Sequence, residues 1–292
     1  MLILPIARKA LRQLTWRRWL MLTGLGVLMV AGVLLEGCQG PTRPTALEGM
    51  SNVEAATGVV VETGVLASQS GCLFDYDLYR PAGTSGAAQV VLAHGFLRNR
   101  ERMQDLARAL AKAGFATASI DLCNMRPWDG AHEANAADMQ LTANTLGRPE
   151  VVYAGFSAGG LAALLAASGD PDTLGVVVLD LVDQGGLGRQ AAADLQVPVV
   201  GLFGAPSRCN ANGNGLPVLV DVVGVEVERF ADATHCDFES PTDNLCRLLC
   251  EPNDRDPDDA ARQRSRVVAS TVAAVSKVWQ SANVSAVDAS ND

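Results

Sequence analysis

Basic residues are scarce over most of this 292-residue chain. The first 37 residues hold five of the 23 Lys and Arg residues but only one of the 32 Asp and Glu residues, so the remainder carries 18 basic and 31 acidic residues, a net charge of −13. A body this acidic repels phosphate backbones, which excludes nucleic acid as an expected partner and makes an anionic membrane surface no better suited. Hydrophobic residues make up 48% of the chain, which is enough for a sizeable core and excludes wholesale disorder.

Charge is absent from residues 19–35, "WLMLTGLGVLMVAGVLL", which follow the basic start. A basic region followed by an apolar run is typical of a secretory signal. The run ends in the letters LEGC, which resemble the bacterial lipobox, where the cysteine (here Cys38) is lipidated. We therefore predict a lipoprotein-type signal over residues 1–37 and a membrane-anchored place in the bacterial cell envelope. Secretion after cleavage, or retention by an uncleaved anchor, are the alternatives.

The cysteines form no compact motif of the kind that binds zinc. Apart from Cys38 there are six, and the nearest pair, Cys246 and Cys250, is a weak C-x-x-x-C signal. An even number of cysteines in an exported chain predicts up to three disulfides, whose connectivity the sequence leaves open. We therefore expect disulfides rather than a metal site. The six cysteines are Cys72, Cys123, Cys209, Cys236, Cys246 and Cys250.

No internal repeat is visible, and from residue 57 onward short apolar runs alternate with helical patterns. The runs that we interpret as strands cover residues 58–68, 72–81, 87–95, 116–122, 149–155, 173–183, 197–206 and 224–233. The helical patterns cover residues 100–115, 132–147, 158–168 and 259–280.

Strands that are apolar throughout are buried on both faces, which is typical of parallel sheets. The pattern predicts an α/β domain over residues 57–281, with a mostly parallel sheet of about eight strands and helices on both faces. Residues 38–56 are polar, contain two prolines and are expected to form a linker. Residues 282–292 are expected to form a flexible tail.

The segment "VVYAGFSAGGLAALLAASG", residues 151–169, turns abruptly at Ser157 between an apolar run and a helical pattern. Gly155 and Gly159 stand two residues before and two residues after that serine. A nucleophilic serine on a sharp strand-to-helix turn needs such small neighbours, because other backbone approaches closely there. We therefore interpret Ser157 as a nucleophile, with a serine that merely caps the helix as the structural alternative.

A second strand end, "AHGFLRN", has the form of an oxyanion turn. A His-Gly-x sequence after a strand can aim a backbone N–H at a developing oxyanion. We expect the backbone N–H groups of Phe96 and Ala158 to form a two-donor hole, and we expect His94 in this turn to be structural.

Histidine is so rare that the general base can be found by elimination among three candidates. His94 belongs to the oxyanion turn. His132 begins a helical pattern, where we expect a surface residue or a pocket rim. His235 follows the last strand, and the order Ser, acid, His is the one expected for this architecture. The sequence therefore predicts His235 as the base.

The acid is less obvious, because no carboxylate follows the strand at 197–206 until Asp221. One strand earlier, "GVVVLDLVD" places Asp180 and Asp183 at a strand end, where a carboxylate can orient His235. We predict Asp180, since it is the first residue past the strand. Asp183 lies where "DQGG" indicates a turn that it can cap. Asp183 and then Asp221 remain the alternative acids.

Together these motifs resemble the α/β-hydrolase superfamily, in its chlorophyllase-like branch. The resemblance spans roughly residues 60–250 and rests on "GFSAGG", "LDLVD", "GLFGAPSRCNANGNG" and "THCDFESPTDNLCRLLC". That branch has a G-x-S-x-G-G elbow, an aspartate at the end of the sixth strand and a late histidine. The resemblance implies the α/β-hydrolase fold, Asp180 as the acid, and ester hydrolysis without a cofactor.

The resulting hypothesis is a serine hydrolase that cleaves small-molecule or lipid-like carboxylic esters through a Ser-His-Asp triad and an acyl-enzyme. Neither a cofactor nor a metal is expected. A peptidase or an acyltransferase uses the same constellation of residues, and an inactive envelope scaffold is a third hypothesis. The presence of Ser, Asp and His candidates together argues against the scaffold.

Overall fold

The computed structural model describes residues 52–54, 58–85, 88–124, 130–220, 222 and 224–289. Within this part of the chain a single sheet has nine strands, in the order β1-β2-β3-β5-β4-β6-β7-β8-β9. The strands are β1 (Asn52–Glu54), β2 (Val59–Ala67), β3 (Leu73–Pro81), β4 (Ala88–Ala93), β5 (Thr117–Ile120), β6 (Gly147–Phe156), β7 (Thr173–Leu179), β8 (Val199–Phe203) and β9 (Glu226–Arg229).

The first three strands are antiparallel, and β3 also pairs antiparallel with β5. From β5 to β9 every neighbouring pair is parallel. Because parallel strands end at the same edge of a sheet, the loops after β4, β6, β7, β8 and β9 all leave from one side. This confirms the predicted mostly parallel sheet.

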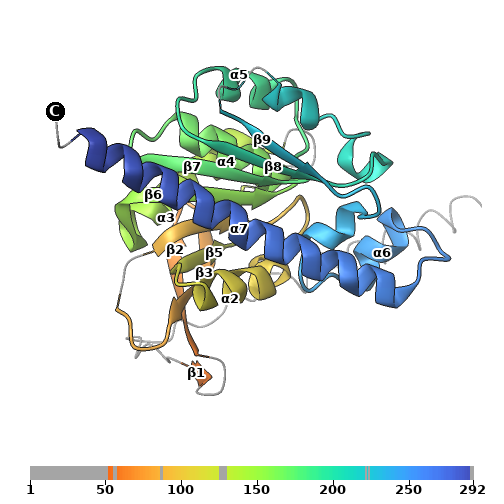
Figure 1. Cartoon of the computed structure of the whole chain (residues 1–292). Helices are drawn as coiled ribbons and strands as arrows, with labels where there is room; N and C mark the ends of the chain where they lie inside the picture. Colours follow the sequence, from red (N-terminus) through yellow and green to blue (C-terminus); the bar gives the residue numbers. More distant parts are fainter. Residues whose placement is uncertain are drawn as a thin grey trace, which may run out of the picture. The chain divides into compact units, whose positions relative to one another are not determined.

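Helices cover both faces of that sheet, as Figure 1 shows, with α2 and α7 on one face and α3 and α4 on the other. The α-helices are α2 (Gln104–Lys112), α3 (His132–Leu146), α4 (Ala158–Ser168), α5 (Leu187–Ala193), α6 (Asn244–Cys250) and α7 (Pro257–Ala289). Short 3-10 helices are η1 (Arg100–Met103), η2 (Arg208–Asn210), η3 (Leu216–Leu219) and η4 (His235–Phe238).

Successive side chains of a strand point to opposite faces, so one apolar strand supplies two cores. Val91 and Ala93 of β4 belong to the cluster that contains α3 and α4. Val90 and Leu92 belong to the cluster that contains α2 and α7. All four side chains are fully buried, which explains why these strands are apolar at every position instead of at alternate ones.

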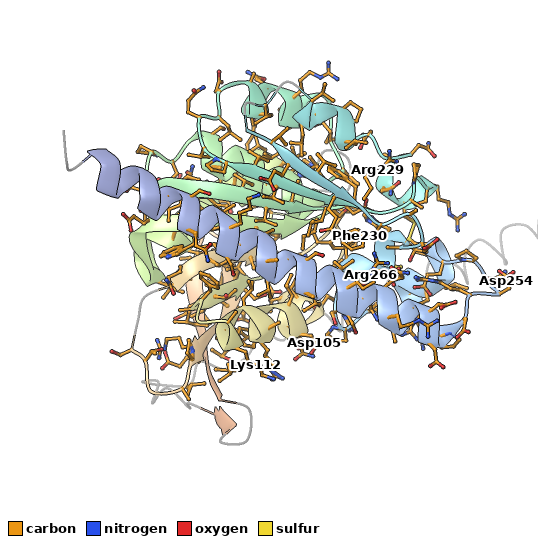
Figure 2. All side chains as sticks on the ribbon, in the orientation of Figure 1. Asp105, Lys112, Arg229, Phe230, Asp254 and Arg266 are labelled. Carbon is orange, nitrogen blue, oxygen red and sulfur yellow. A yellow bond between two sulfur atoms is a disulfide. The ribbon has the colours of Figure 1, made fainter. Side chains whose placement is uncertain are left out.

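Helix α7 also supports the loop that follows β9. The guanidinium of Arg266 lies 5.4 Å from the centre of the Phe230 ring, and both side chains are labelled in Figure 2. Phe230 in turn meets the ring of Phe238 edge-on at 5.9 Å between centres. Because Phe238 is the last residue of η4, this stack connects α7 to the segment that begins with His235.

Three features of the fold differ from the expectation. Strand β1 lies inside the expected linker and pairs with β2, which brings the strand number to nine. Helix α7 runs to Ala289, past position 281, because no Gly or Pro interrupts the sequence there. The seven-residue helices α5 and α6 were not predicted, since two turns are too short to produce a clear period.

The six cysteines pair into three disulfides, Cys72–Cys123, Cys209–Cys250 and Cys236–Cys246. Two of them hold α6, which contains Cys246 and Cys250. Among the residues that the structure describes, no helix has both the length and the apolar character needed to cross a membrane. The predicted signal over residues 1–37 and the lipid on Cys38 lie outside the described residues.

Candidate active site

Ser157 stands between the last residue of β6 and the first residue of α4. Its φ of 55° and ψ of −118° lie in a region that residues with a Cβ rarely adopt. Such a strained turn persists when the surrounding structure holds it. Here the Ser157 N–H donates to the carbonyl of Leu179 on β7 at 2.9 Å, and α4 begins at once behind it. The side chain is thereby placed on the edge where the parallel strands end.

The two glycines beside the serine are required by close backbone contacts. A Cβ on Gly155 would collide with the backbone carbonyl of Gly159, and a Cβ on Gly159 would collide with the backbone carbonyls of Ala93 and His94. The turn at Ser157 is therefore packed directly against the end of β4. This contact is the physical reason for the G-x-S-x-G spacing.

Three of the predicted side chains come together at this edge. The Nε2 atom of His235 is 3.1 Å from the Oγ of Ser157, and its Nδ1 is 2.6 Å from the Oδ2 of Asp180. All three residues are buried, with exposed fractions of 6% for Ser157, 7% for His235 and 1% for Asp180. The carboxylate at Nδ1 favours the tautomer in which Nδ1 carries the proton, so Nε2 is left to accept the serine proton.

Asp180 has further partners that the sequence analysis missed. Its Oδ1 accepts the N–H of Gly204 at 3.0 Å, and the side-chain amide of Asn210 donates to Oδ2 at 3.1 Å. Asn210 is itself fully buried, and its amide also donates to the carbonyl of Ala205 at 2.9 Å. Together with the contact to His235, these bonds fix the orientation of the carboxylate. The segment "NANGNG" gave no signal for this role, because nothing in it shows which asparagine faces inward.

Asp183 lies elsewhere. Its Oδ1 accepts the N–H of Gly188 at 2.8 Å, so the side chain caps the start of α5, as expected for a turn residue. Its backbone N–H donates to the Oδ1 of Asn214 at 3.1 Å. The third candidate acid, Asp221, lies outside the described residues.

The remaining two histidines are both buried. His94 donates from Nδ1 to the carbonyl of Gly95 at 2.7 Å and accepts the N–H of Leu122 at Nε2, at 2.9 Å. Burial lowers its pKa to about 4, so the ring is neutral and fully engaged by backbone. His132 has an exposed fraction of 7% and lies against Gly130 at the start of α3. The expected surface position of His132 is therefore wrong, because its ring is buried against the backbone of Gly130, while a place at a pocket rim stays a prediction.

The expected oxyanion turn lies against the serine. A Cβ on Gly95 would come within 3.2 Å of the Cβ of Ser157, so the backbone at Gly95 borders the serine. Ala158 is the first residue of α4, where an N–H has no acceptor within the helix. Phe96 is 36% exposed, so its side chain is not part of the core. The role of the Phe96 and Ala158 N–H groups as oxyanion donors stays a prediction.

The ring of Phe156 packs against the ring of His235. Its ring is buried, and its centre lies 4.6 Å from the centre of the His235 ring at an angle of 42°. A contact of this kind restricts the orientation of the imidazole. Phe156, the residue before Ser157, therefore helps to hold the ring of His235 in place.

Two groups of described side chains have the spacing of a metal site. The groups are Cys236, Cys246 and Cys250, and Cys72, Cys123 and Asp138. Every cysteine in both groups is disulfide-bonded, and a disulfide sulfur is not the thiolate that a metal requires.

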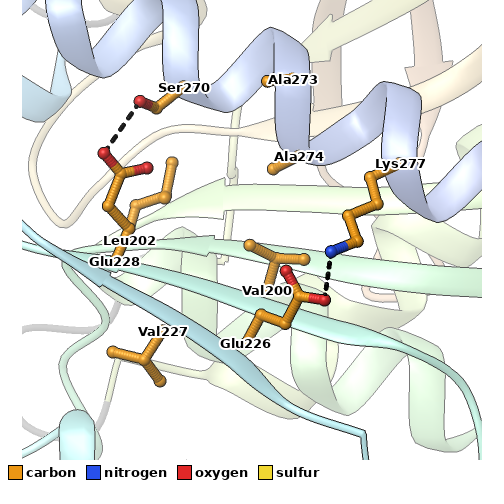
Figure 3. Close-up of a pocket in the computed structure, with 9 residues that line it drawn as sticks. All are labelled: Val200, Leu202, Glu226, Val227, Glu228, Ser270, Ala273, Ala274 and Lys277. Carbon is orange, nitrogen blue, oxygen red and sulfur yellow. Dashed lines mark hydrogen bonds and ion pairs between the residues drawn. The ribbon is translucent and has the colours of Figure 1, made fainter.

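A separate cavity of about 190 Å³ lies between β8, β9 and α7 (Figure 3). Its polar side chains are paired across it: Lys277 contacts Glu226 at 2.5 Å, and Ser270 donates to Glu228 at 3.1 Å. We call this cavity the β9 groove.

No protein-family model matches the chain, and no curated protein matches it in sequence. Solved structures do resemble it. A dienelactone hydrolase from Anabaena variabilis aligns at 19% identity and a TM-score of 0.52, over 71% of this chain and 95% of the other. A brefeldin A esterase, described as a bacterial homologue of human hormone-sensitive lipase, aligns at 16% identity and a TM-score of 0.55, over 89% of this chain and 86% of the other.

A dienelactone hydrolase-like promiscuous phosphotriesterase from metagenomic libraries aligns at 17% identity and a TM-score of 0.54, over 75% of this chain and 98% of the other. At these identities the likeness concerns the fold. The activities of these proteins do not transfer to this chain by similarity alone.

Proposed function

We propose that this chain, which has the α/β-hydrolase fold, is a serine hydrolase that cleaves carboxylic esters. The observation that carries the proposal is the continuous set of contacts from Ser157 Oγ to His235 Nε2, at 3.1 Å, and from His235 Nδ1 to Asp180 Oδ2, at 2.6 Å. The fold neighbours named esterases and hydrolases support ester cleavage as the class of reaction.

In the proposed reaction, His235 takes the proton of Ser157 as the Oγ attacks the ester carbonyl. Asp180 holds the imidazole and stabilises the positive charge that it acquires. The N–H groups of Phe96 and Ala158 receive the oxyanion of the tetrahedral intermediate. His235 then protonates the departing alcohol, and a water activated by the same residue releases the acid from the acyl-serine.

The substrate class that fits is a small-molecule or lipid-like ester, with neither a nucleic acid nor a metal involved. Purified domain should be tested against p-nitrophenyl esters of increasing acyl length. Ser157→Ala is expected to lower kcat by about 10⁶, as in a serine protease of the subtilisin type. The matched control is Ser168→Ala, at the exposed end of the same helix. Circular dichroism should show that both variants remain folded.

Residual activity of Ser157→Ala above a few per cent would show that another group is the nucleophile. Hydrolysis of peptides but not of esters would favour a peptidase, and product formation that depends on an added alcohol would favour an acyltransferase. A wild-type protein that is inactive on all three would favour the scaffold.

We also propose that Cys38 carries lipid and places the domain in the cell envelope, because an apolar run ending in LEGC follows the basic start. Intact-mass measurement of membrane-extracted protein should give a chain that begins at residue 38 with added acyl mass. A chain that still begins at Met1, or an unmodified Cys38, would contradict this.

A further inference from the structure

The turn that carries Phe96 is strained. Leu97 has a φ of 56°, in the left-handed region that favours glycine, and the N–H of Arg98 closes the turn on the carbonyl of Gly95 at 3.1 Å. Because Gly95 borders Ser157, a small change in this turn moves the Phe96 N–H relative to the reacting carbonyl. Something outside the turn must therefore hold it.

The next residue supplies that contact. The guanidinium of Arg98 grips the carboxylate of Glu239 with two parallel hydrogen bonds, Nε to Oε2 at 2.7 Å and Nη2 to Oε1 at 2.8 Å. The Glu239 side chain is fully buried and that of Arg98 is 11% exposed. Nη2 of Arg98 also contacts Oδ1 of Asp243 at 2.8 Å. The Glu239 carboxylate is buried away from water and is bonded through both of its oxygens, so the pair is held in one geometry.

The opposite end of this contact is anchored independently of Arg98. The N–H of Ser240 donates to the carbonyl of Arg102 at 2.7 Å, and the Oγ of Ser240 donates to Asp105 on α2 at 2.9 Å. Asp243 caps α6, which the disulfides hold. The segment that follows His235 is therefore fixed by several contacts of its own, and Arg98 connects the turn at Phe96 to it.

We propose that Arg98 is a positioning residue that holds the Phe96 N–H in place for the oxyanion, through its paired hydrogen bonds to Glu239. This inference rests on the proposed ester hydrolysis. It connects the loop after β4 to the loop after β9, so the oxyanion donor and the general base keep one relative position.

The chemistry explains why arginine is needed. Burial lowers the pKa of the Arg98 guanidinium, but its hydrogen bonds to Glu239 and Asp243 outweigh burial and raise the pKa above its usual value. The group is thus permanently charged and planar, and it matches both carboxylate oxygens at once. A lysine provides one point of contact and leaves the turn free to rotate.

The test uses a variant that removes both partners, Arg98→Met with Glu239→Leu, so that no buried charge is left unpaired. Arg98→Lys is the conservative variant. Arg102→Ala is the matched control, because Arg102 contacts the same Asp243 at 3.6 Å from outside the turn. Each protein is assayed for kcat, KM and melting temperature with a short p-nitrophenyl ester. Each is also assayed for its affinity for an aryl trifluoromethyl ketone, to which Ser157 adds while His235 takes the proton.

We expect the double variant to melt close to the wild type but to lose about 10²-fold in kcat, the size associated with one oxyanion donor. KM should change little, and affinity for the trifluoromethyl ketone should fall by a factor similar to the fall in kcat. The kcat and ketone affinity of Arg98→Lys should lie between those of the double variant and the wild type. Those of Arg102→Ala should match the wild type.

A folded double variant with wild-type kcat and ketone affinity overturns the proposal while ester hydrolysis stands. A double variant whose KM rises while its kcat stays at the wild-type value also overturns it. If the wild-type protein neither cleaves esters nor binds the ketone, the proposed function fails, and this inference falls with it.

Discussion

The candidate active site and the β9 groove contain similar side chains in opposite settings. In the β9 groove the paired side chains of Glu226 and Lys277 are 50% and 59% exposed, so water competes for both charges. At the site the side chains of Asp180 and His235 are 1% and 8% exposed, and they meet at 2.6 Å. The difference teaches that residue type alone does not distinguish the two places, whereas the burial of the charged side chains does.

The backbone shows the same contrast. Leu97, Ser157 and Asp180 all have positive φ angles, between 44° and 56°. The residues that line the β9 groove belong to β8, β9 and α7, or directly adjoin these regular elements. Each unfavourable backbone conformation costs about 1–3 kcal/mol and persists where contacts hold it. Three of them at the ends of β4, β6 and β7 therefore indicate a place where geometry is enforced.

The largest effect that would sharpen this comparison comes from the two aspartates after β7. Asp180→Asn keeps the size of the side chain but removes the charge that orients His235, and it should lower kcat by about 10⁴. Asp183→Asn is the matched control, because Asp183 caps α5 and an asparagine can still cap a helix. Initial rates with a p-nitrophenyl ester measure both. A large loss in the Asp183 variant with a mild loss in the Asp180 variant would reverse the assignment.

The next effect concerns covalent cross-links, which hold the site and not the β9 groove. Replacing Cys209 and Cys250 together by serine should lower the free energy of unfolding by about 2–4 kcal/mol, because the unfolded chain gains freedom. Urea unfolding monitored by tryptophan fluorescence measures this. Thiol titration of denatured, unreduced wild-type protein should find few free thiols, and six free thiols would refute the pairing.

A smaller effect follows from His94. Its pKa is lowered by burial to about 4, whereas an unfolded histidine titrates near 6.5. Between these values the unfolded chain binds more protons, so the stability present above about pH 6.5 is lost as the pH falls toward about 4. The contribution is at most about 1.4 kcal/mol per pH unit. Urea unfolding at several pH values should show a shallower acid dependence for His94→Asn, and an unchanged slope would contradict this.

The smallest effect is expected in the β9 groove. Lys277→Ala removes an exposed ion pair with Glu226, which should change the free energy of unfolding by at most about 0.5 kcal/mol and leave kcat unchanged. The same unfolding and ester assays apply. A marked loss of activity in this variant would show that the groove takes part in function, and the comparison would break.

Local patterns in the sequence were sufficient for much of the fold. The runs that are apolar at every position predicted the parallel sheet, and the helical pattern after Ser157 placed α4 at 158–168, where the structure has it. The α/β-hydrolase fold is confirmed, while the chlorophyllase-like branch stays a prediction. The G-x-S-x-G spacing placed Ser157 correctly on a strand-to-helix turn, because that spacing reflects contacts within a few residues.

What the sequence could not predict depends on contacts between distant residues. Asn210 reaches Asp180 across 30 positions, and Arg98 reaches Glu239 across 141. Neither pair leaves a local pattern, since each partner is an ordinary polar residue in its own segment. The burial of His132 was not predicted because the residue types alone do not show that its ring packs against Gly130.

The backbone conformation of Ser157 lowers the stability of the fold. A glycine at this position would relieve a strain of about 1–3 kcal/mol. That gain exceeds the roughly 0.5–1 kcal/mol that glycine loses through its freedom in the unfolded chain. Ser157→Gly is therefore expected to give a more stable fold that has lost its nucleophile. The stability of the fold and the hydroxyl that the proposed reaction needs therefore place opposite demands on this one residue.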